Sequence, residues 1–111
     1  MAHTEESLNA LKRNDLVCIM ECEYGFRTYG YAMNTYCNYK KQTMVKLILT
    51  FQRCNIKVDN TVTQCLLTKG QIAQKLFFSY GIIFTPHEIT YIPRDEFIVL
   101  FNNLIDGVVA K

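Results

Sequence analysis

The residues from Thr68 to Gly81 form the segment that most constrains how this chain can fold. Thr68 is followed three residues later by Gln71, which is the spacing of a capping box at a helix N-terminus. Gly81 stands where a glycine in a left-handed conformation commonly ends a helix. The apolar residues that recur at helical spacing between these ends are Ile72, Leu76 and Tyr80. The sequence therefore predicts a helix over 69–80 with one buried face.

Two further helices are predicted near the ends of the chain. Thr4 is a suitable N-cap for a short helix over 5–13, because acidic residues follow it directly. Pro93 suits the first position of a final helix, with Asp95 and Glu96 in its first turn. The apolar positions that give this last helix its period are Phe97, Leu100, Phe101, Leu104, Ile105 and Val108.

Between the first and second predicted helices the composition favours β-strands. The segment 43–51, "TMVKLILTF", places Val45, Leu47 and Leu49 on one face if it is extended. Gly25 marks a turn or a bulge between the first two strands. The predicted strands are 16–24, 26–33 and 43–51, with shorter ones at 56–58, 61–67, 82–84 and 89–92.

This order of elements predicts the fold class. A chain of 111 residues is near the common size of one domain, so residues 1–111 are expected to form a single α+β domain. Short connections between the strands favour a mostly antiparallel, twisted sheet. The N-terminal, middle and C-terminal helices would cover one face of that sheet.

Composition excludes several classes of protein. The longest purely apolar runs have five residues, whereas a membrane-spanning helix needs about twenty, so no membrane association is expected. The first residues lack the basic and apolar regions of a secretory signal, which predicts an intracellular protein, cytoplasmic or nuclear. An odd number of cysteines in such a protein argues against a disulfide framework.

Charge and aromatic residues are concentrated in the segment 24–58. It contains six of the twelve basic residues and seven of the fourteen aromatic residues but no acidic residue. The first 23 residues, by contrast, carry five acids and two bases. Such asymmetry is typical of a surface that binds nucleic acid or an acidic partner.

The stretch "RTYGYAMN", 27–34, partly resembles the RNP1 signature of RNA-binding sheets. The residues that match are Arg27, Tyr29, Gly30 and Tyr31, and those that depart from the pattern are Thr28, Ala32 and Asn34. The order of three consecutive strands followed by a helix resembles the cold-shock and OB-fold layout more than that of an RRM. This resemblance implies an OB-like sheet whose binding face includes 26–39.

A strand over 26–33 would place Tyr29 and Tyr31 on one face, about 7 Å apart, where bases of a single strand could stack. Lysines nearby could contact the phosphates. The predicted nucleic-acid-binding residues are Arg27, Tyr29, Tyr31, Tyr36, Tyr39, Lys40, Lys41 and Lys46. The alternative is that these tyrosines face inward as core residues and that the lysines form an ordinary solvated surface.

The sequence gives little support for a metal site or a catalytic site. In a strand, Cys18 and Cys22 would lie about 13 Å apart, too far to share a zinc ion, so no metal site is predicted. His87 could approach Cys37 or Cys65 in space, but nothing selects a nucleophile, and a turn histidine is the simpler interpretation. The sequence therefore predicts a non-enzymatic binding protein without a cofactor.

A protein–protein interaction subunit or inhibitor is the alternative function. The last predicted helix is apolar over about half of its circumference, which is more than packing on one sheet requires. A second subunit could cover the surplus, and a homodimer is the commonest such assembly. The predicted interface residues are the six apolar positions of that helix, from Phe97 to Val108. A core helix would explain the same pattern.

Overall fold

The computed structural model describes residues 2–26, 39–61 and 64–106. All regular structure within these ranges is helical, and they contain no strand. The elements are α1 (Glu5–Asn9), α2 (Arg13–Cys22), α3 (Lys41–Cys54), α4 (Lys69–Tyr80), α5 (Pro86–Tyr91), α6 (Arg94–Leu100) and the π-helix η1 (Phe101–Asp106). The predicted α+β fold with an antiparallel, OB-like sheet is therefore wrong.

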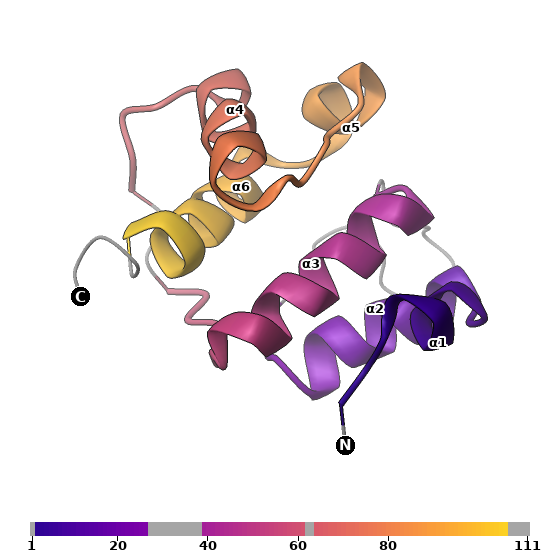
Figure 1. Cartoon of the computed structure of the whole chain (residues 1–111). Coiled ribbons are helices and arrows are strands. Elements are labelled where there is room, and N and C mark those ends of the chain that lie inside the picture. The colour runs from indigo at the N-terminus through magenta and orange to yellow at the C-terminus, as the bar shows by residue number, and fades with distance from the viewer. Residues whose placement is uncertain (1, 27–38, 62–63, 107–111) are drawn as a thin grey trace.

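The first three helices pack together in the N-terminal half of the chain. Both α1 and α2 contact α3, which crosses the middle of the molecule in Figure 1. The chain then leaves α2 through Gly25, whose φ of 75° allows the sharp turn predicted there. This turn brings the ring of Phe26 to within 5.7 Å of the Phe51 ring, centroid to centroid, inside the core.

The second half forms its own group of helices beside α3. Figure 1 shows α4, α5 and α6 on the side of α3 opposite α1 and α2. The helix α4 contacts α5, α6 and η1, and α6 runs directly into η1. The two groups meet where Thr43 donates to the Ile83 carbonyl and where Cys54 donates to the Tyr80 hydroxyl. One continuous core results, to which both halves contribute buried apolar side chains.

The segments 16–24 and 43–51, predicted as strands, fold largely as helices because their apolar residues also fit a helical period. In α3 the fully buried residues Met44, Leu47, Ile48 and Phe51 follow the i, i+3, i+4, i+7 spacing of one helix face. The alternation of Val45, Leu47 and Leu49 satisfies a strand pattern over the same residues. Burial of the wider helical stripe outweighs the weak strand preference of individual residues.

The capped helices fold as the sequence predicts. The Thr68 side chain accepts from the Gln71 N–H and the Gln71 side chain accepts from the Thr68 N–H, which forms the predicted capping box of α4. Gly81 ends this helix with a φ of 73°. The N-cap at Thr4 is also confirmed. Pro93 is the N-cap of α6, one position before the first helical position that was predicted for it.

Several predicted boundaries are corrected. The helix expected over 5–13 ends at Asn9, and Arg13 already begins α2. The residues 56–58 and 82–84 are irregular, and most of 89–92 belongs to α5. The described part of 61–67 is also irregular, whereas the predicted strand 26–33 falls almost entirely outside the described residues.

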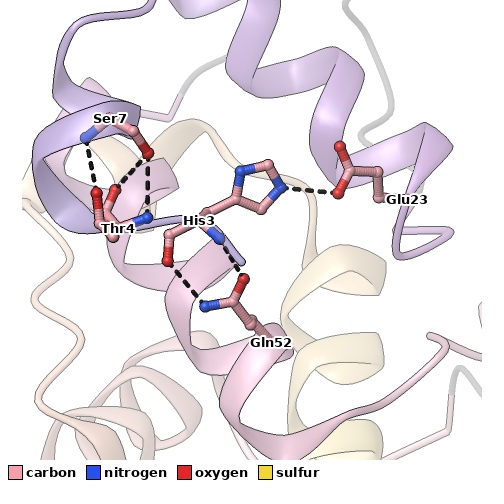
Figure 2. Close-up of polar contacts among 5 residues, drawn as sticks. All are labelled: His3, Thr4, Ser7, Glu23 and Gln52. Carbon is pink, nitrogen blue, oxygen red and sulfur yellow. Dashed lines mark hydrogen bonds and ion pairs between the residues drawn. The ribbon is translucent and has the colours of Figure 1, made fainter. Parts of the chain in front are cut away.

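The N-terminal segment is attached to α3 by a reciprocal pair of hydrogen bonds. Figure 2 shows that the His3 N–H donates to Gln52 Oε1 while Gln52 Nε2 donates to the His3 carbonyl. His3 Nε2 also lies 2.7 Å from Glu23 Oε1, just beyond the end of α2. These contacts fix the approach of the chain to the Thr4 cap and so the position of α1.

In the described ranges, each helix is too short or too polar to traverse a lipid bilayer.

Candidate functional site

A pocket of about 670 Å³ opens at the start of α3. Its walls come from α1, from the first turns of α3 and from the segment 81–85 that follows α4. Three lysines line it, Lys40, Lys41 and Lys46, together with one acidic residue, Glu5. Three ammonium groups against one carboxylate leave the pocket with a positive field that favours an anionic ligand.

Each lysine is positioned by a different neighbour. The backbone N–H of Lys40 donates to Glu88 Oε2 at 2.7 Å, which leaves its exposed side chain at the pocket wall. The half-buried Lys41 extends its Nζ to the carbonyl of Asn9 at the end of α1, 2.6 Å away. Lys46 passes beside Gly81, where an added Cβ would lie 3.7 Å from Lys46 Cε. A side chain at Gly81 would therefore narrow the pocket.

The start of α3 adds the electrostatics of a helix N-terminus. Its N-cap is Lys40, which provides no side-chain hydrogen bond, and its first turn contains no acidic residue. The first N–H groups of a helix have no partner within the helix and carry partial positive charge. Because the pocket is lined by this same turn, the positive charges of the lysines and of the helix N-terminus act on it together, opposed by Glu5 and by the Glu88 carboxylate at the Lys40 N–H.

Two buried carboxylates bind the residues that lead into α3. Glu88 is fully buried, and its second oxygen, Oε1, accepts from the Thr85 N–H at 2.8 Å as part of the α5 capping box. Glu96 is also buried, and it accepts from the Tyr39 hydroxyl at 2.7 Å. The Arg13 guanidinium in turn donates to the Tyr39 carbonyl at 2.6 Å. Contacts from α2, α5 and α6 thus fix the residues that lead into α3.

The charge asymmetry of the sequence extends beyond the predicted region. Between Tyr24 and His87 the sole acidic residue is Asp59, whereas eight residues there are lysine or arginine. The next acidic residue, Glu88, is buried and already accepts two backbone hydrogen bonds. A surface built from α3 and α4 therefore has few exposed carboxylates to repel an anion.

Of the predicted nucleic-acid-binding residues, the structure brings the three lysines together at this pocket. Tyr39 is 1% exposed, and its ring packs edge-on against Phe26 in the core, so it could stack on a base only by leaving that core. The predicted residues that lie outside the described ranges are Arg27, Tyr29, Tyr31 and Tyr36.

The predicted interface helix is part of the core. Phe97, Leu100 and Leu104 are fully buried, and Phe101 and Ile105 are half-buried against the same core. Val108 lies outside the described residues. Among the described residues, the large apolar side chains that are exposed instead are Leu66, Phe77, Phe78, Ile83 and Tyr91. The sequence pattern does not single out these side chains, because the exposure of an apolar side chain depends on how the helices pack together.

The helical fold changes the relation between two cysteines. Cys18 and Cys22 lie one turn apart on the exposed side of α2, not about 13 Å apart along a strand. The neighbouring Cys22 raises the pKa of the Cys18 thiol because two thiolates would repel each other, and desolvation adds to this. Within the described part of the chain, no three metal-ligating side chains gather at one place. His87 is on α5, where its ring stacks on Tyr91 at 4.6 Å.

The sequence contained a capping signal at Glu88, but strands were predicted on either side of it. Thr85 and Glu88 have the T-x-x-E spacing of a capping box, which is the same pattern that predicted α4. The bond from Glu88 to the Lys40 N–H spans 48 residues and has no local signature. The cap could therefore have been found from the sequence, but its role at the lysine pocket could not.

Comparisons with models of protein families, with curated proteins and with solved structures found no match to this chain.

Proposed function

We propose that this protein is a non-enzymatic, intracellular binding module for RNA or single-stranded nucleic acid, and that the lysine pocket at the start of α3 holds the phosphates. The observation that carries the proposal is the convergence of Lys40, Lys41 and Lys46 on one pocket at a helix N-terminus without its own cap. Phosphate contacts of this kind supply most of the affinity of sequence-independent binding. Base stacking by the tyrosines of 27–36 remains a prediction, and the proposal does not depend on it.

The test is fluorescence anisotropy of labelled single-stranded and duplex oligonucleotides at two or more salt concentrations. The wild-type protein is expected to prefer single strands and to bind more weakly as salt rises. The double variant Lys40→Ala/Lys46→Ala should bind about tenfold more weakly at low salt and should lower the slope of log K against log salt by about 2. Lys41 is left intact because its Nζ also holds the end of α1.

Two further variants serve as controls. Lys57→Ala removes an exposed lysine that does not line the pocket, and it should leave both affinity and salt slope near the wild-type values. Glu5→Gln removes the carboxylate of the pocket and should strengthen binding. An equal loss in the Lys57 and pocket variants, or no binding by the wild type at low salt, would refute the proposal.

A protein partner is the second candidate, because several large apolar side chains are exposed. Leu66 and Phe78 are the most exposed of these. Such residues, when they gather in one patch, commonly mark a protein interface. If a homodimer forms through them, the double variant Leu66→Ser/Phe78→Ser should sediment as a monomer where the wild type sediments as a dimer. A wild-type monomer at all accessible concentrations would exclude the homodimer.

A further inference from the structure

A second, apolar groove lies beside the lysine pocket. It has a volume of about 360 Å³ and is formed by one side of α4, by the segment after it and by α5. The ring of Phe77, 47% exposed, stands at one wall, and Phe84 and Ile89 form the floor as half-buried side chains. Gln74 lies at the rim and carries an amide that can both donate and accept.

The groove and the lysine pocket adjoin at one residue. Ile83, 66% exposed, lines both of them, so a ligand that fills one reaches the edge of the other. A ligand that fills both the groove and the lysine pocket must carry an anionic group next to a flat or apolar group. None of the residues that line the groove is charged, so its walls do not repel an anion that adjoins it.

We propose that the groove takes an unstacked nucleobase of a strand whose adjoining phosphate lies in the lysine pocket. A nucleotide has the required arrangement, because its charged phosphate and its flat base are neighbours on one backbone. The exposed Phe77 ring supplies a stacking surface, and the Gln74 amide can bond to a base edge. Because a base inside a duplex cannot present its face, the groove selects single strands. This inference rests on the proposed function.

The experiment separates the base from the phosphate. Anisotropy is measured with a labelled single-stranded oligonucleotide and with an abasic strand of the same length, which keeps the phosphates. Phe77→Ala should lower the affinity for the intact strand about tenfold and leave the affinity for the abasic strand unchanged. Leu66→Ala is the control, since this apolar side chain is exposed and lines neither the groove nor the lysine pocket, and it should change neither affinity.

A second variant tests the groove without removing any side chain. Gly70 lines the groove and has an ordinary backbone conformation, and an added Cβ would lie 4.0 Å from Thr68 Oγ1, an ordinary contact, so Gly70→Leu should fold normally. The leucine would fill part of the groove. It should weaken binding of the intact strand and leave binding of the abasic strand unchanged. Circular dichroism and thermal unfolding would verify that both variants are folded.

The outcomes distinguish the two proposals. Wild-type affinity of both Phe77→Ala and Gly70→Leu for the intact strand would overturn the base pocket and leave the phosphate site standing. Equal losses on intact and abasic strands would also overturn it, because the effect would then not involve a base. If the wild type binds neither strand, the proposed function itself fails, and an apolar segment of a partner protein becomes the occupant to test.

Discussion

The helices α3 and α4 begin in different ways, and the difference explains both where the sequence predicted structure and where a ligand can bind. The helix α4 carries its own cap, the reciprocal pair of Thr68 and Gln71. The helix α3 begins at Lys40 with no side-chain cap, and the Lys40 N–H is satisfied by Glu88 from α5. A helix that is capped by its own residues has a local sequence signature. A helix held by distant residues has none, and its first turn stays open to an outside anion.

The largest expected effect comes from removing the distant support of α3. Glu88→Ala removes the acceptor of the part-buried N–H groups of Lys40 and Thr85, and we expect it to lower the free energy of unfolding by about 3 kcal/mol. Glu88→Gln keeps one acceptor oxygen and should lower the free energy of unfolding by less. Urea denaturation followed by circular dichroism gives both values. A loss below that of an ordinary surface substitution would show that α3 does not need this contact.

The local cap of α4 is expected to contribute less. Thr68→Ala removes the acceptor for the Gln71 N–H at the exposed start of the helix, and we expect a loss of about 1 kcal/mol. Thr68→Ser keeps the hydroxyl and serves as the matched control, with stability near that of the wild type. If Thr68→Ala costs as much as Glu88→Ala, the proposed contrast between local and distant capping does not hold.

Giving α3 a cap of its own should stabilise the protein and weaken the ligand site at the same time. Lys40 has the extended backbone of an N-cap residue, with φ of −73° and ψ of 153°, so Lys40→Ser can accept from the first turn without strain. We expect a gain of about 0.5 kcal/mol in the free energy of unfolding. Oligonucleotide affinity should fall, because one lysine is lost and an N–H is occupied.

Lys40→Ala separates these two effects, since it removes the charge without adding a cap. If Lys40→Ser binds nucleic acid no more weakly than Lys40→Ala, the open N–H groups do not take part in binding. If Lys40→Ser gains no stability over Lys40→Ala, the first turn of α3 already has its partners.

The same contrast shows what the sequence could and could not predict. The helix α4 and the Thr4 cap were predicted because their signals lie within a few residues of the structure they specify. The segment 43–51 contains Val45, Leu47 and Leu49, whose alternation is compatible with a strand, and only packing of Met44, Leu47 and Phe51 against other helices decides for a helix. The lysines were predicted as ligands for phosphate, but their pocket depends on α1 and on the segment after α4.

The last expected effect, a modest dependence of stability on pH, concerns the C-terminal ends of α3 and α4, where the two helices meet. Tyr80, the last residue of α4, donates to the Leu104 carbonyl at 2.6 Å and accepts from Cys54 of α3. Desolvation and the Cys54 contact raise the pKa of Tyr80 to about 12. An unfolded tyrosine ionises near pH 10. The stabilising effect of the neutral hydroxyl is therefore fully present below pH 10 and is lost as the pH rises toward about 12.

Tyr80→Phe tests this link between the two helices, because phenylalanine cannot ionise. At pH 9 the variant should be less stable than the wild type by about 1 kcal/mol, the value of one hydrogen bond. The gap should then narrow at pH 10 and above, since only the wild type loses stability through Tyr80. The narrowing is expected to be modest because Tyr80 is only partly buried and water screens its charge. A gap that stays constant up to pH 11 would mean that the hydroxyl ionises equally in the folded and unfolded chains, and no gap at pH 9 would mean that it does not link the two helices.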